Sequence, residues 1–74
     1  MNEELYMMID QLGRYISNME SNIDELLYFS DEYAYFLDSP EAYADAQIIH
    51  ENAERIMIEI EKLVEQREKL IKKI

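Results

Sequence analysis

The chain has 74 residues and no cysteine, and its 17 acids against 7 bases give a net charge of -10 at pH 7. This length holds one domain at most, and the lack of cysteine excludes disulfides, thiolate zinc sites and cysteine catalysis. Because the chain has one Gly and one Pro among many helix-forming residues, its composition favours helix over sheet and predicts a single all-α domain over residues 1–74.

Apolar residues recur at alternating spacings of four and three through the first half of the chain. The series is interrupted only at Ser30, and its members are Leu5, Ile9, Leu12, Ile16, Met19, Ile23, Leu26, Tyr33 and Leu37. This spacing is typical of the a and d positions of a coiled coil, and it predicts one helix over residues 3–38. Because serine is a good helix cap, an alternative is that Ser30 begins a separate short helix over 31–38, which gives three helices in all.

A turn is predicted at residues 38–40. Proline disfavours helix in the residue before it, while Ser39 is a good N-cap and Pro40 suits the first helical position. After the turn the same spacing resumes with Arg67 as its one polar member, and the others are Ala46, Ile49, Ala53, Ile56, Ile60, Leu63, Leu70 and Ile74. The sequence therefore predicts a second helix over residues 40–73 and an antiparallel helical hairpin of the coiled-coil type.

In such a hairpin, residues equally distant from the turn lie opposite one another. This places Arg67 beside Asp10 and Gln11, and an ion pair between Asp10 and Arg67 would set the register rather than add much stability. Gly13 lies in the same region and costs about 1 kcal/mol inside a helix. It either makes room for the Arg67 side chain or for a second chain, or it is a tolerated surface glycine.

The first helix carries more apolar side chains than one partner helix covers. Those outside the strict a/d series are Tyr6, Met8, Tyr15, Leu27, Tyr28, Phe29 and Phe36. Because a lone hairpin buries only one stripe of each helix, we expect two copies to associate into a four-helix bundle. The predicted assembly is therefore a homodimer.

No catalytic or metal-binding constellation is found in the sequence. His50 has no partner histidine, and Gln47 stands where a di-iron helix needs glutamate. Two Glu-x-x-Glu pairs lie on the second helix beside bases, where helical salt bridges explain them. We therefore expect a non-enzymatic protein without a cofactor or a metal ion.

The sequence also bears on the compartment. No stretch reaches the roughly 18 apolar residues that a membrane helix needs, and the first residues lack the basic region of a signal peptide. We therefore expect a cytoplasmic protein that does not bind membranes.

The acids are concentrated in the first two thirds of the chain. Residues 15–54 hold ten acids and no Lys or Arg, whereas residues 47–74 hold six acids and six bases. Five acids share one seven-residue grid: Asp10, Asp24, Asp31, Asp38 and Asp45. Glu25 and Glu32 follow this grid one position later. On the first helix these spacings give two adjacent acidic stripes outside the apolar series.

Six of the eight aromatic residues lie between Tyr28 and Tyr43, near the expected turn. Carboxylates accept paired hydrogen bonds from arginine, and tyrosine supplies rigid contact area. We therefore predict a binding surface for a basic protein, made of Asp24, Glu25, Asp31, Glu32, Tyr33, Tyr35, Asp38, Glu41 and Asp45. Because an acidic surface repels nucleic acid, we expect no direct binding to nucleic acid.

In its size, its base-free stretch 15–54 and its Asp- and Tyr-rich segment from Asp24 to Asp45, the chain resembles small acidic helical proteins encoded by bacterial viruses. Some of these inhibit host DNA-binding enzymes, including nucleases and RNA-guided systems, and several act as DNA mimics. The resemblance implies an anti-CRISPR or anti-restriction inhibitor in a bacterial host cell. No functional residue is carried over from it.

The predicted function is therefore inhibition of a nucleic-acid-binding enzyme, with the acidic, Tyr-rich surface placed on the basic channel of that enzyme. One alternative is a structural coiled-coil assembly or adaptor protein, whose partner docks on the apolar stripe of the first helix. Another alternative is an acidic antitoxin that neutralises a basic toxin. The antitoxin shares the electrostatics of the inhibitor and differs only in its target.

Overall fold

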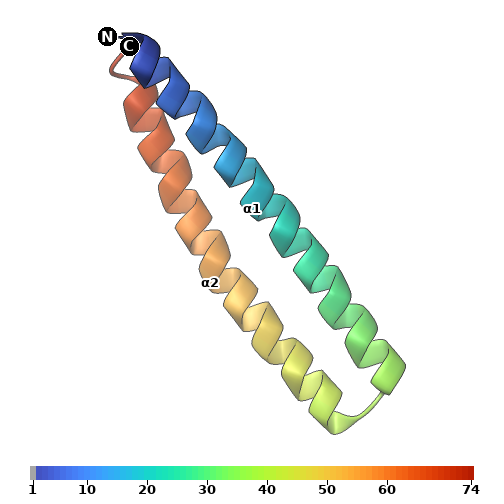
Figure 1. The fold of residues 1–74 in the computed structure, drawn as a ribbon. Coiled ribbons are helices and arrows are strands. Elements are labelled where there is room, and N and C mark those ends of the chain that lie inside the picture. Colours follow the sequence, from blue (N-terminus) through green and yellow to red (C-terminus); the bar gives the residue numbers. More distant parts are fainter. Residues whose placement is uncertain (1) are drawn as a thin grey trace.

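The computed structural model describes residues 2–74 and consists of two antiparallel helices (Figure 1). Helix α1 spans Asn2–Leu37 and helix α2 spans Pro40–Ile71. The two chain ends lie together at one end of the molecule and the turn lies at the other (Figure 1), so the hairpin is 56 Å long and only 15 × 10 Å across. The predicted all-α helical hairpin is confirmed.

The turn is closed by a cap on each helix. Asp38 has a φ of 44°, and its N–H donates to the Ala34 carbonyl at 3.0 Å, which ends α1 in the left-handed conformation common after helices. Ser39 is extended and its hydroxyl accepts a hydrogen bond from the Ala42 N–H at 3.1 Å. The predicted N-cap at Ser39, with Pro40 in the first turn, is confirmed.

One narrow interface, which we call the seam, joins the two helices. On α1 its buried members are Ile9, Ile16, Ile23 and Ser30, which recur every seven residues, together with Ala34 near the turn. On α2 the fully buried members are Ala42, Ala46, Ala53 and Ile60. The main apolar cluster extends from the middle of the hairpin toward the chain ends. Its buried members are Ile16, Ile23, Ala53 and Ile60, and the partly buried residues that pack against them are Leu12, Met19, Leu27 and Leu63. Near the turn the buried residues are small.

Helix α1 continues without a break through Ser30, so the three-helix alternative is wrong. Ser30 is fully buried, and among the described residues its hydroxyl oxygen has no hydrogen-bond partner. Its role in the seam is therefore that of a small residue rather than a helix cap.

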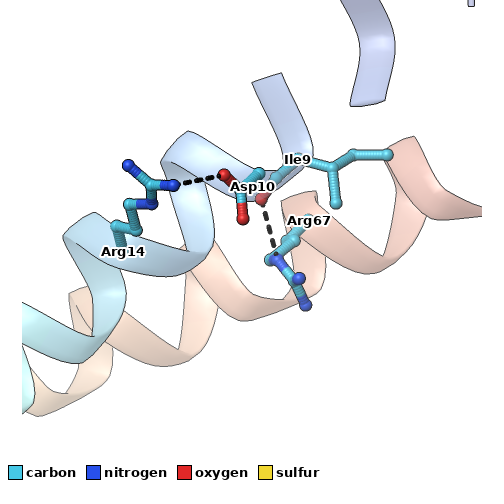
Figure 2. A network of polar contacts seen from close by, with 4 residues as sticks. All are labelled: Ile9, Asp10, Arg14 and Arg67. Carbon is cyan, nitrogen blue, oxygen red and sulfur yellow. Dashed lines mark hydrogen bonds and ion pairs between the residues drawn. The ribbon is translucent and has the colours of Figure 1, made fainter. Parts of the chain in front are cut away.

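Arg67 does not pair with Asp10, which corrects the predicted ion pair. Figure 2 shows that Asp10 binds Arg14 one turn further along α1, at 3.0 Å, while the Arg67 Nε donates to the Ile9 carbonyl at 3.0 Å. Gly13 explains this contact. A side chain in a helix points toward the N-terminus and covers the preceding turn, so a side chain at position 13 would cover the Ile9 carbonyl, whereas glycine leaves it open. A Cβ on Gly13 would lie 3.0 Å from the Arg67 Nε. Gly13 therefore makes room for Arg67, and the arginine joins the helices through a backbone carbonyl.

The hairpin exposes more surface than a compact protein of its mass. Its accessible surface is 6087 Å², whereas a globular monomer of this mass exposes about 4,800 Å². Because each helix buries one stripe, many large apolar side chains remain exposed, among them Met8, Tyr15, Phe29 and Phe36. Within residues 2–74, neither helix has a segment apolar enough over a sufficient length to cross a membrane.

The contact between Gly13 and Arg67 predicts a coupled effect of two substitutions on stability. In an Arg67→Ala background, Gly13→Ala should gain about 1 kcal/mol from helix propensity. In the wild-type background the gain should be smaller, because the new methyl group is 3.0 Å from the Arg67 Nε and the arginine must shift to accommodate it. Urea unfolding of the four proteins at one concentration measures both effects. An equal gain in both backgrounds would show that Gly13 and Arg67 are independent.

Ser30 predicts a stabilising substitution. Ser30→Ala removes a buried hydroxyl that lacks a partner, and it should raise the free energy of unfolding by about 1 kcal/mol. Ser30→Leu, which restores an apolar coiled-coil residue but overfills a seam of small residues, should lower it. Thermal unfolding followed by circular dichroism gives both values, and a loss of stability in Ser30→Ala would mean that the hydroxyl is hydrogen-bonded.

Candidate functional site

The nine residues predicted to bind a partner lie in the half of the hairpin that ends at the turn. Tyr33 is half-buried and the other eight are exposed. Exposure on this scale leaves the carboxylates available to a partner. The nine residues do not share one face, however, and their positions around the two helices decide which of them act together.

Three of the predicted carboxylates recur every seven residues, and we call them the acidic row: Asp24 and Asp31 lie on α1, and Asp38 directly follows its last residue. Asp24 and Asp31 directly follow the buried Ile23 and Ser30, and Asp38 follows Leu37, which is 56% exposed at the end of α1. The acidic row therefore lies about 100° around α1 from the seam, and its members are about 10.5 Å apart along the axis. Glu25 and Glu32 lie about 100° further round, on the outer side of α1.

Two side chains of α2 reach the acidic row, and neither was among the predicted site residues. The His50 Nε2 lies 2.9 Å from the Asp31 Oδ1, and the Tyr43 hydroxyl donates to the Asp38 Oδ1 at 2.7 Å. Both lie nearly as far from the turn as the acid that they contact, so the hairpin register was the signal that could have identified them. Asp31 and Asp38 of the acidic row are therefore each hydrogen-bonded to a side chain of α2.

Asp45 is separated from the acidic row, although it shares the same seven-residue grid in the sequence. It lies five residues before His50 on α2, which is about 140° around the helix. Because His50 contacts Asp31, Asp45 faces the other side of the hairpin. The turn resets the helical phase, so a sequence grid that crosses it does not continue in space.

The remaining predicted residues have separate surroundings. Tyr33 lies in the seam and stacks on Phe29, with ring centroids 6.1 Å apart, while Tyr35 is 79% exposed and meets the ring of Phe36 edge-on. Glu41 lies in the first turn of α2, where the helix dipole favours a negative charge. These residues surround the acidic row without belonging to it.

The hairpin turns the uneven charge of the sequence into two different ends. The half that contains the turn, residues 24–54, carries nine acids and no Lys or Arg, a net charge of -9. We call this half the acidic end. The other half, residues 1–23 with 55–74, carries eight acids and all seven bases, a net charge of -1.

Phenol groups at the acidic end are held protonated by neighbouring carboxylates. The hydrogen bond to Asp38 raises the pKa of Tyr43 above its ordinary value of 10.0, and the charge of that carboxylate acts in the same direction. Glu32 raises the pKa of Tyr28 in the same way. Both phenols therefore ionise at higher pH than a free tyrosine, and the Tyr43 hydroxyl donates a hydrogen bond to one of the predicted carboxylates, Asp38.

An open groove lies between the helices at the start of the acidic row. Its apolar lining comes from Ile23, Met57 and Ile60, and its carboxylates from Glu20, Asp24 and Glu61, around about 310 Å³. An arginine or lysine side chain suits such a groove, because its aliphatic stem covers apolar surface while its charged head binds carboxylates. Glu20 and Glu61 were not predicted, since their proximity depends on the pairing of the two helices.

Within residues 2–74, no group of three or more His, Asp or Glu side chains is arranged to hold a metal ion. No protein-family model, curated protein or solved structure matches the chain. The function of the protein is therefore inferred from the geometry and the charge of the hairpin.

The contact between Tyr43 and Asp38 predicts a pH-dependent property. The phenol of Tyr43 should ionise at higher pH than a free tyrosine, and Asp38→Asn should lower its pKa toward 10.0. Since the raised pKa belongs to the folded state, the stabilisation is present below pH 10 and is lost as the pH rises through the folded-state pKa. Subtracting the absorbance titration of Tyr43→Phe from that of the parent isolates this phenol. Asp45→Asn is the control and should leave the curve unchanged.

Proposed function

We propose that the protein is a non-enzymatic binding protein that inhibits a nucleic-acid-binding enzyme by placing its acidic end on the basic channel of that enzyme. The observation that carries the proposal is the division of charge along the hairpin, -9 at the acidic end and -1 in the other half. Solubility alone would be served by acids and bases interspersed over the whole surface. A base-free acidic end is suited to a basic partner.

The acidic row supplies the specific contacts in this proposal. Each of Asp24, Asp31 and Asp38 accepts hydrogen bonds from an arginine or lysine of the channel, and charge-assisted bonds of this kind are the strong ones. Their spacing of about 10.5 Å is about three times the rise between successive phosphates on one DNA strand. The row therefore does not copy the phosphates one for one, and it competes with nucleic acid by occupying the cations that bind the backbone.

We also propose that two copies associate into a four-helix bundle. The large exposed surface supports this, because two helices alone leave a wide apolar area in contact with water. Association covers apolar surface and leaves the fold of each hairpin unchanged.

The exposed apolar side chains of α1 favour a second candidate function, that of a structural coiled-coil assembly or adaptor protein. Met8, Tyr15, Phe29 and Phe36 are each more than half exposed. An adaptor of this kind would bind the apolar face of a partner helix, and its carboxylates would serve only to solvate it. The two functions therefore differ in which surface the partner contacts.

Capture of partners from bacterial lysate on the tagged protein, with and without added duplex DNA, tests the inhibitor. The expected result is retention of a DNA-binding enzyme, its displacement by the DNA, and a steep loss of binding between 50 and 500 mM NaCl, as electrostatic contacts require. A triple variant, Asp24→Asn with Asp31→Asn and Asp38→Asn, should lose the enzyme.

The matched control is Glu59→Gln with Glu65→Gln and Glu68→Gln, three exposed acids outside the groove at the start of the acidic row. It changes the net charge by the same amount in the other half of the hairpin and should retain most of the binding. A partner that is captured equally by both triple variants, and that ignores DNA and salt, would overturn the inhibitor and favour the adaptor.

A further inference from the structure

A second line of side chains runs along α1 on the side away from the acidic row. Its members recur every seven residues, each directly before a seam position, and they are Met8, Tyr15, Asn22, Phe29 and Phe36. We call this line the apolar row. Because Asn22 and Asp24 are two positions apart, the apolar and acidic rows are separated by about 160° around α1. The four apolar members are 55%, 54%, 58% and 77% exposed, in chain order.

The apolar row is symmetric about its centre. Tyr15 and Phe29 each lie seven residues from Asn22, and Met8 and Phe36 each lie fourteen residues from it. Two antiparallel copies of such a row are self-complementary, since a two-fold axis at Asn22 places Met8 opposite Phe36 and Tyr15 opposite Phe29. A two-fold interface requires one patch to match itself in this way.

We propose that the apolar row is the dimer interface, in which α1 packs antiparallel against α1 of a second copy with the two-fold axis at Asn22. This inference rests on the proposed self-association and names its surface and its direction. The two Asn22 amides meet at the axis, where a single polar pair fixes the register of a helical interface.

The surface area favours a second copy as the occupant of this row. The hairpin exposes 6087 Å², about 1,300 Å² more than a compact monomer of its mass. A standard stable interface buries about 800 Å² on each partner. Two open grooves of about 200 and 220 Å³ lie along the same side of the hairpin, at Tyr15 with Leu70 and at Asn22 with Ile56. They provide space for the aromatic side chains of the second copy.

Charge selects the antiparallel direction. In a parallel pair, two acidic ends of net charge -9 lie side by side and repel each other. In the antiparallel pair, each acidic end lies beside the half of the other copy that holds all seven bases. The acidic row remains free in this dimer, because it lies on the other side of α1 from the apolar row.

The other side of α1 is a poorer interface. The corresponding seven-residue line there is Tyr6, Gly13, Glu20, Leu27 and Ala34. Glu20 lies at its centre, Leu27 and Ala34 already pack against α2 or are buried, and the acidic row borders it. A second copy on that side would bury carboxylates without partners, at a high cost in desolvation.

Cysteine cross-linking tests this geometry, because the chain has no cysteine of its own. A tagged Met8→Cys protein is mixed with an untagged Phe36→Cys protein and oxidised. The antiparallel dimer should give the mixed disulfide as the main product, and neither protein alone should cross-link. Asn22→Cys should form a disulfide with itself, whereas Ser17→Cys, an exposed position on the opposite side of α1, should not.

The mass in solution, measured by sedimentation equilibrium, separates the possible failures. The expected mass is twice 8.9 kDa, for the wild type and for the acidic-row triple variant alike. A monomer at all concentrations would overturn the self-association. A dimer in which Met8→Cys and Phe36→Cys each cross-link with themselves would overturn the antiparallel direction, and a dimer with no cross-link at any of the three row positions would overturn the surface. None of these results bears on whether the acidic end binds an enzyme.

Discussion

The seam between α1 and α2 is the constraint on which every other feature of the hairpin depends. It fixes the rotation of α1, and through the seven-residue repeat it fixes what lies on each side. A member of the apolar row precedes each fully buried position from Ile9 to Ser30, and a polar residue follows it. Two surfaces of opposite character therefore run the length of one helix. If the seam were shifted by one residue along the sequence of α1, the helix would be rotated by about 100° and both surfaces would face other directions.

The length of the hairpin makes its two ends electrostatically independent. The molecule extends over 56 Å, whereas charges in physiological salt are screened over about 8 Å. Apart from Arg55, which directly follows Glu54, the bases lie further toward the termini and do little to offset the carboxylates near the turn. A partner at the acidic end therefore meets a strongly negative charge rather than an average over the chain. A compact fold of the same composition would mix these charges. The extended shape preserves their separation, and this is how an elongated fold serves an electrostatic surface.

The spacing of apolar residues predicted the helices and the turn, because burial along a helix has a period that the sequence displays. The side-chain contacts between the two helices were harder to predict, because they depend on which neighbouring groups already have partners. Arg67 was placed beside Asp10, but Arg14 already lay one turn from that carboxylate, and Gly13 left the Ile9 carbonyl open to the arginine. The predicted binding surface was grouped by a grid that crossed the turn. Such a grid holds in space only within one helix, which is why Asp45, on the second helix, lies apart from the acidic row.

The end that carries the charge is also the end with the least apolar burial. Isoleucines fill the seam toward the termini, while Ser30, Ala34, Ala42 and Ala46 fill it near the turn. A buried isoleucine stabilises a fold by roughly 1.5–3 kcal/mol and an alanine contributes much less, and nine mutually repelling carboxylates oppose compaction there. The acidic end is therefore held by a core of small side chains, together with its caps and the contacts of His50 and Tyr43. Segments of low local stability are those that adjust on binding, and cations from a basic partner would relieve the repulsion at that end. The same carboxylates that weaken the free hairpin near its turn are those that a partner would neutralise.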